Sequence, residues 1–413
     1  MNHVDRRQVV DDYRGYLGAG RARLAEFMSV PVEIEAHGAI VRTSDGRELI
    51  DCGGYAVFLL GHTHPAVVEA VSRQLHTNPL ATRLLLDPLH AGAARALCGI
   101  APEGLDKVFF TNSGAEATEL AIKLARANGK TALMTMRRGF HGKTLGALSV
   151  TANDRYQSIF RPLFDVDVID FGDLTALEQQ LRQCAGRGAL FVEPIQGEGG
   201  VVIPPPGYLS AVADLCAQFG ALLIVDEIQT GLGRCGSMWA HQPEVSRPDI
   251  LLVGKALSGG VVPVAAVLAT DEVFRPIGDD PTLHTSTFGG SPLASAAVIA
   301  TVNTLVADRI PEHAEEVGTR MLTGLREACR PWMDSLVREV RGRGLLIGIE
   351  FERPDLVAEV GSVLLSHGVI VNHSLNNHGV LRLTPPAVIT RAEERAVVAA
   401  FEKALIEVSG TVS

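Results

Sequence analysis

Three short apolar runs, each followed by an ionisable residue, constrain the fold of this chain more than any other feature. The runs are residues 189–192, 221–225 and 250–253; Glu193 and Asp226 follow the first two directly, and Gly254–Lys255 follow the third. A strand that is apolar at every position is buried on both faces, which is typical of a parallel sheet covered by helices. The runs therefore predict an α/β fold.

A helix is predicted between the first and second runs. From Pro206 onward, Leu209, Val212 and Phe219 recur at helical spacing, and Gly220 stands where such a helix would end. This alternation of strand and helix favours a mostly parallel central sheet. In open sheets of this kind, ligands bind beyond the carboxyl ends of the strands.

We therefore expect Glu193, Asp226 and Lys255 to converge on one crevice. The alternative is that polar residues simply follow strands where turns begin. That alternative explains any single strand well, but three successive strands, including a lysine and an aspartate, favour a site.

The chain of 413 residues is long for a single core, which favours two domains. After about residue 305 the pattern changes to long helices, near 317–328 and 397–408, around an alternating strand at 345–351. We expect a large cofactor-binding domain at residues 61–305. Residues 1–60 and 306–413 would form a smaller α+β domain.

Charge and cysteine content exclude several classes of function. The chain has 37 basic and 47 acidic residues and a net charge of −10, which argues against nucleic acid or an anionic membrane as partner. Its six cysteines are scattered, it lacks an HExxH-type metal motif, and no apolar run approaches the ~20 residues of a membrane span. The charged N-terminus lacks the apolar core of a signal peptide. We expect a cytoplasmic protein with no metal.

Lys255 and Asp226 carry the most specific chemistry. A buried lysine with a lowered pKa is a competent nucleophile toward an aldehyde. A carboxylate ~4 Å from a pyridine nitrogen, at an effective dielectric near 20, favours the protonated ring by about 4 kcal/mol. A protonated ring is the electron sink of pyridoxal chemistry. Lys255 lacks the glycines of a phosphate-binding P-loop, and no GxGxxG follows an early strand.

Three further segments carry weaker signals. Ser113 and Glu116 fit a capping box at a helix start that could bind phosphate, or could be only a cap. Phe140 and His141 lie between two glycines, where an aromatic face can stack on a flat ring, or could form a packed turn. Arg382 alternates with apolar neighbours and suits a substrate carboxylate, although a solvated edge arginine is an equal alternative.

The motifs together resemble the class III, fold type I aminotransferases from near residue 35 to the C-terminus. The matching stretches are TNSGAEATELAIKLAR, GFHGKTLGALS, EPIQGEGG, DEIQTGLGR, GKALSGG, HTSTFGGSPLA and LRLTPP. Within the family the chain most resembles the putrescine and ornithine aminotransferases, and LLDPLHA, PPPGYL, LHTSTFGG and SLNN resemble the putrescine group in particular. Ala115 departs from this group, which tends to have threonine there.

The resemblance implies pyridoxal 5'-phosphate as cofactor, bound by Lys255 as a Schiff base. It implies that Asp226 pairs with the pyridine nitrogen and that a dimer forms in which Thr287 reaches the partner's phosphate. Arg382 would bind the keto-acid carboxylate, and Glu198 would neutralise Arg382 when a cationic amine binds. The other expected cofactor-binding residues are Ser113, Gly114, Ala115, Phe140, His141, Glu193 and Gln229.

The implied reaction is a ping-pong transfer from a terminal amine to a keto acid such as 2-oxoglutarate. The donor would be a diamine, an ornithine-like compound or an ω-amino acid. A PLP-dependent aminomutase, racemase or decarboxylase of the same class is the alternative, and a non-enzyme on this fold is a further one.

Overall fold

A seven-stranded sheet forms the centre of the computed structural model, which describes residues 4–245 and 247–412. Its strand order is β4-β10-β9-β8-β7-β5-β6. The five neighbouring strands β6, β5, β7, β8 and β9 run parallel to one another, and β10 is antiparallel to both β9 and β4. The expected mostly parallel α/β sheet is confirmed. Its strands are Lys107–Thr111 (β4), Ala132–Met136 (β5), Val166–Ile169 (β6), Gly188–Val192 (β7), Leu222–Asp226 (β8), Ile250–Val253 (β9) and Ala265–Ala269 (β10).

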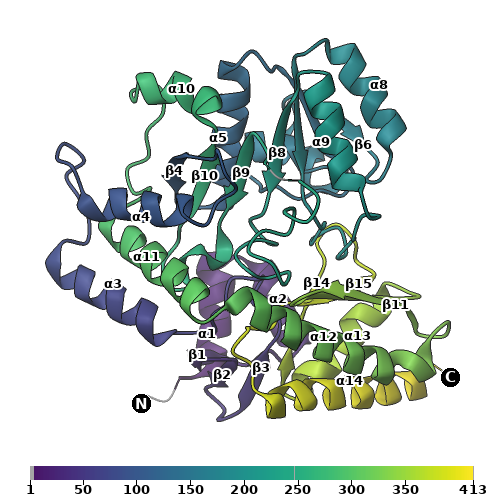
Figure 1. Ribbon diagram of the computed structural model, residues 1–413. Coiled ribbons are helices and arrows are strands. Elements are labelled where there is room, and N and C mark those ends of the chain that lie inside the picture. The colour runs from purple at the N-terminus through teal and green to yellow at the C-terminus, as the bar shows by residue number, and fades with distance from the viewer. Residues whose placement is uncertain (1–3, 246, 413) are drawn as a thin grey trace.

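Alternate residues of the apolar strands pack into two different clusters, one on each face of the sheet. Leu223 and Val225 of β8 belong to the cluster that contains residues of α8 (Leu174–Cys184) and α9 (Tyr208–Gln218). Leu222 and Ile224 belong to the cluster of α5 (Gly114–Ala127). Burial of each leucine or isoleucine stabilises the fold by about 1.5–3 kcal/mol. Helices thus cover both faces, as the uninterrupted apolar runs predicted (Figure 1).

The helix predicted between β7 and β8 is α9, and it ends where Gly220 was expected to end it. Gly220 has a φ of +61°. The N–H of Gly220 donates to Ala217 O and that of Ala221 to Cys216 O, which is the double closure of a Schellman motif. This turn leads directly into β8 and so sets the position of Asp226.

Two four-stranded sheets lie outside the central one. The first has the order β1-β2-β3-β13 and the second β11-β12-β15-β14. In Figure 1, helices α12 (Ile310–Cys329), α13 (Asp355–Ser366) and α14 (Arg391–Val412) lie along the second sheet. Helix α4 (Pro88–Cys98) contacts β4, and α11 (Pro292–Ala307) packs against both α4 and α3 (Pro65–Thr77). The strands are Glu33–His37 (β1), Ile40–Thr43 (β2), Glu48–Asp51 (β3), Val337–Arg343 (β11), Leu346–Phe351 (β12), Val369–Ile370 (β13), Asn372–His373 (β14) and Val380–Leu383 (β15).

The helices that follow residue 305 agree with the predicted change of pattern. The long helix and the closing helix expected there are α12 and α14. The strand expected to be half-buried is β12, but it is buried at every position except Glu350, because it lies between β11 and β15.

Besides α5, α8 and α9, the helices of the described chain are Arg6–Asp12 (α1), Ala19–Phe27 (α2), Pro65–Thr77 (α3), Pro88–Cys98 (α4), Leu145–Val150 (α6), Asp154–Gln157 (α7), Asp271–Asp279 (α10), Pro292–Ala307 (α11), Ile310–Cys329 (α12), Asp355–Ser366 (α13) and Arg391–Val412 (α14).

We propose that residues 61–305 form one domain, and 1–60 with 306–413 the other. All seven central strands lie within 61–305, and every strand of the two smaller sheets lies outside it, which supports the division. Within the described residues no single helix is long and apolar enough to cross a membrane; α11 and the helical segment ending at Trp332 reach that length only as a pair bent by 66°.

Candidate active site

The three ionisable residues predicted to converge do lie at one edge of the central sheet. Because β7, β8 and β9 are parallel neighbours, their carboxyl ends meet there. Asp226 ends β8, Glu193 follows β7, and Lys255 begins a short 3-10 turn, Lys255–Ser258, with a φ of +45°. Asp226 and Glu193 are buried.

Lys255 lies deep in the protein yet remains partly exposed, because it lines a pocket of about 330 Å³. Burial lowers the pKa of Lys255; the carboxylate of Glu198 opposes this shift and the guanidinium of Arg382 adds to it. A lowered amine pKa increases the neutral, nucleophilic fraction of the side chain at neutral pH.

The pocket joins Lys255 to the start of α5. Ser113 and Gly114 line it, as expected for a phosphate site. Sequence reasoning missed the other lining residues, although part of this set lies within the quoted GKALSGG stretch. They are Val57, Asn112, Ser258, Gly260 and residues 261–264.

Helix α5 begins with Ser113 as its cap, but not as a full capping box. Ser113 Oγ accepts from Glu116 N at 3.3 Å, as predicted. Glu116 Oε2, however, accepts from the backbone and side-chain amides of Asn112, both at 2.9 Å, and not from Ser113 N. The prediction of a reciprocal box is therefore wrong by one residue. The first N–H groups of α5 lack partners inside the helix and face the Lys255 pocket from its N-terminus.

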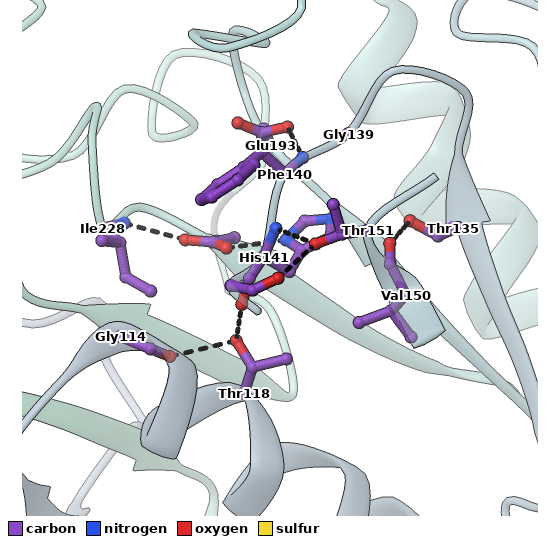
Figure 2. A network of polar contacts seen from close by, with 12 residues as sticks. Gly114, Thr118, Thr135, Gly139, Phe140, His141, Val150, Thr151, Glu193 and Ile228 are labelled. Carbon is purple, nitrogen blue, oxygen red and sulfur yellow. Dashed lines mark hydrogen bonds and ion pairs between the residues drawn. The ribbon is translucent and has the colours of Figure 1, made fainter. Parts of the chain in front are cut away.

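Asp226 is held by two contacts. Its Oδ2 lies 2.7 Å from His141 Nδ1, and its Oδ1 accepts from Ile228 N at 3.0 Å (Figure 2). Burial works to lower the pKa of His141, but the hydrogen bond and charge of Asp226, with the charge of Glu193, outweigh it and raise that pKa. The sequence indicated both residues but not their pairing, because they lie 85 positions apart.

His141 is itself fixed by two threonines. Its N–H donates to Thr151 Oγ1 at 2.9 Å, and its carbonyl accepts from Thr118 Oγ1 at 2.8 Å. Thr118 belongs to α5, so these bonds tie the pair formed by His141 and Asp226 to the same helix whose start lines the pocket (Figure 2).

Phe140, which precedes His141 in the chain, contacts Glu193 (Figure 2). The Phe140 N–H donates to Glu193 Oε2 at 3.1 Å. Burial raises the pKa of Glu193 to about 7, against the opposing effect of His141 and with the added effect of Asp226. Glu193 thus holds the backbone that carries Phe140. The sequence indicated Phe140 as a ring-stacking residue or part of a packed turn, but not its contact with Glu193.

Gln229 is buried, and its Nε2 has no hydrogen-bond partner among the described residues. Its side chain lies against Gly197, where an added Cβ would approach Gln229 Oε1 to 1.9 Å. Glycine at position 197 therefore permits the observed orientation of Gln229. An unpaired buried amide is costly, which favours a ligand acceptor at this place.

Arg382 and Glu198 form a buried ion pair, with 1% and 3% of their side chains exposed. The Arg382 Nη1 to Glu198 Oε1 distance is 2.5 Å. None of the guanidinium nitrogens of Arg382 has a hydrogen-bond partner within the described chain. The contact is therefore electrostatic, and the guanidinium donors remain available to a ligand carboxylate. The alternative of a solvated edge arginine is wrong, because β15 lies between β12 and β14.

Thr287 is exposed and does not line the Lys255 pocket. It lines a separate hollow of about 860 Å³ together with Phe288 and residues 80–83, 85–88, 90–91 and 290–291. Arg83 holds this loop by donating to Thr287 O at 2.8 Å and to Gly289 O at 2.9 Å. Leu84 and Leu86 beside it have 93% and 101% of their surface exposed.

The residues present fit pyridoxal phosphate. A primary amine and a helix N-terminus line one pocket, the carboxylate of Asp226 ends the neighbouring strand, and Gln229 and Arg382 present unpaired buried donors. Phe140 is half-buried beside them.

Comparison with known proteins finds similar sequences and structures along nearly the whole chain. The family model of the class-III aminotransferases matches residues 25–405. An ornithine aminotransferase from Toxoplasma gondii is 32% identical, with a TM-score of 0.87 and 99% of each chain covered. An ornithine aminotransferase from Plasmodium yoelii is 30% identical, with a TM-score of 0.83 over 98% of this chain and 99% of that one. An (S)-enantioselective omega-transaminase from Thermomicrobium roseum is 28% identical, with a TM-score of 0.88 over 98% and 99%.

Proposed function

Because this chain belongs to the class III aminotransferases and is a PLP-dependent enzyme, we propose that it transfers an amino group from a terminal amine to a keto acid such as 2-oxoglutarate. The donor is a diamine, an ornithine-like compound or an ω-amino acid. Ornithine aminotransferases and an omega-transaminase among the similar structures support a terminal-amine donor.

Pyridoxal phosphate, when bound, supplies an aldehyde for the amine and a ring that accepts electrons from the substrate carbon. Lys255 Nζ would hold the cofactor between turnovers and, with its lowered pKa, would move the proton at the substrate carbon. Asp226 would keep the ring nitrogen protonated, and His141 holds the carboxylate of Asp226 in place. Ser113, Gly114 and Ala115 would hold the phosphate at the start of α5, Phe140 would pack against the ring, and the unpaired Gln229 Nε2 would donate to the ring hydroxyl.

The observation that carries the substrate proposal is the buried pair of Glu198 and Arg382. With Glu198 beside it, the guanidinium is neutralised and the site accepts a donor that has no carboxylate near the reacting amine. With Glu198 displaced, the unpaired guanidinium donors bind the carboxylate of a keto acid in two-point contact. One site can therefore take two unlike substrates in turn, which is the requirement of a ping-pong reaction.

We also propose that the enzyme acts as a homodimer in which Thr287 reaches the phosphate bound by the partner subunit. Its exposure and its absence from the lining of the Lys255 pocket in its own chain support this role. The exposed leucines at 84–86 and Phe288 give the surrounding surface the apolar character of a subunit interface.

A single-turnover experiment with a donor panel tests the proposed reaction. The panel contains diamines, ornithine derivatives and ω-amino acids, and no acceptor is added. A transaminase accumulates the amine form of the cofactor, visible in its absorbance, and 2-oxoglutarate then restores the starting spectrum. A return to the starting spectrum without acceptor would contradict the proposal and favour a racemase, mutase or decarboxylase.

The role of Arg382 has its own test. Arg382→Ala should abolish recovery of the aldehyde form by 2-oxoglutarate while a diamine still converts the cofactor. If the second half-reaction proceeded unimpaired, the assigned role of Arg382 would be wrong.

A further inference from the structure

The loop that joins β14 to β15, residues 374–379, reaches from the smaller sheet to the edge of the central sheet (Figure 1). Its Leu375 N–H donates to Glu198 Oε2 at 3.1 Å. The carboxylate of Glu198 therefore has one oxygen beside Arg382 and the other on this loop. For Glu198 to leave Arg382, its bond to Leu375 must also break.

Asn376, the next residue of the loop, is bonded to three other segments of the chain. Its backbone N–H donates to Glu198 O at 2.9 Å. Its side-chain Nδ2 donates to Arg138 O at 2.9 Å and to Gly139 O at 3.0 Å. Its Oδ1 accepts from Asn153 Nδ2 at 2.8 Å.

These bonds connect the segment that carries Phe140 to the segment that carries Glu198. Gly139 immediately precedes Phe140, and Glu198 is the partner of Arg382. The side chain of Asn376 therefore anchors the loop to the backbone beside the expected ring-stacking residue, and the backbone of the same loop holds Glu198. A further bond, from Tyr156 Oη to Leu375 O at 2.9 Å, fixes the loop from α7.

We propose that Asn376 is a positioning residue that keeps Glu198 on Arg382 and so favours the amine donor over the keto acid. The inference rests on the proposed function, because it assumes that Glu198 shields Arg382 during the donor half-reaction. Loosening the loop removes the Leu375 N–H from Glu198. The carboxylate then leaves Arg382 more readily, which disfavours the donor and leaves the acceptor unaffected or favoured.

The test compares Asn376→Asp with Asn377→Asp in the full-length, cofactor-loaded enzyme. Both variants add one negative charge to the same loop. Asn377 Oδ1 accepts only the local N–H of Gly379, and aspartate at position 377 retains this bond. Aspartate at position 376 has no side-chain N–H, so it loses the two hydrogen bonds that Asn376 Nδ2 donates to Arg138 O and Gly139 O. A second variant, Tyr156→Phe, removes one bond from the loop and adds no charge.

The readout is kcat/KM for each half-reaction, measured separately by the absorbance of the cofactor with a diamine and with 2-oxoglutarate. The loss of two hydrogen bonds predicts that Asn376→Asp lowers the donor value about tenfold. The acceptor value should stay constant or rise, and Tyr156→Phe should shift the ratio in the same direction by a smaller factor. Asn377→Asp should leave the ratio of the two values unchanged.

Equal losses in both half-reactions would overturn the inference, because a purely structural role lowers both alike. The same shift in Asn377→Asp would also overturn it, since added charge would then be the cause. Failure of the proposed function is distinguishable, because it appears in the wild-type enzyme as no conversion by any terminal amine or no recovery by the keto acid.

Discussion

Replacement of Glu198 by glutamine is the sharpest perturbation of the proposed charge exchange. The change keeps the size of the side chain and removes the charge that faces Arg382. At the observed 2.5 Å and an effective dielectric of 20, the attraction between the two charges is about 7 kcal/mol. Desolvation of both groups offsets part of this, and removal of one partner of such a buried pair typically costs about 3–5 kcal/mol.

This cost should fall on the donor half-reaction alone. With a diamine bound, the variant leaves the guanidinium uncompensated, so about 3 kcal/mol corresponds to a loss of roughly 100-fold in kcat/KM for the donor. With 2-oxoglutarate, the substrate supplies the missing carboxylate. The acceptor value should therefore remain at the wild-type level or increase.

The assay measures both half-reactions by the absorbance of the bound cofactor under single-turnover conditions. Glu339→Gln is the matched control, because Glu339 is a carboxylate with 56% of its side chain exposed that pairs with another arginine, Arg341. It removes the same charge and should leave the donor-to-acceptor ratio unaltered. A Glu198→Gln enzyme whose two half-reactions slow by the same factor would refute the reasoning, as would one with a normal donor reaction.

Three further outcomes are expected. Borohydride reduction of the cofactor-loaded enzyme should label Lys255 on peptide mapping, and Lys255→Ala should reduce turnover by about 10⁴-fold; a label on another lysine would contradict the assignment. Burial raises the pKa of Glu193 to about 7, so the folded state retains a proton that the unfolded chain loses above its ordinary value near 4.5. Stability should therefore fall as the pH rises toward 7, and urea midpoints should show that Glu193→Gln removes part of this slope. In Gly197→Ala the new Cβ would displace the flexible end of Gln229, so the cofactor absorbance should change while the melting temperature stays nearly constant; the reverse result would exclude the proposed contact of Gln229.

The sequence by itself determined three strands of the central sheet, β7, β8 and β9, and the position of the chemical residues that follow them. Runs that are apolar at every position can be satisfied only between two helical layers, and β7, β8 and β9 are such strands. Since parallel strands end at the same edge, the residues after them had to meet. Gly220 could be recognised as the end of α9 from the sequence as well, because glycine readily adopts the left-handed conformation that closes a helix.

Only the tertiary structure decided which of these residues contact each other. His141 reaches Asp226 across 85 positions, and Asn376 reaches Gly139 across 237, and neither pairing leaves a periodic pattern in the sequence. The burial of Arg382 likewise depends on strand order, because β15 lies between β12 and β14. The sequence could not predict this order, since an alternating pattern is the same in a strand at the sheet edge and in the strand next to it. Local preferences and hydrophobic pattern act over a few residues, whereas the charges and hydrogen bonds of this site depend on segments that only folding brings together.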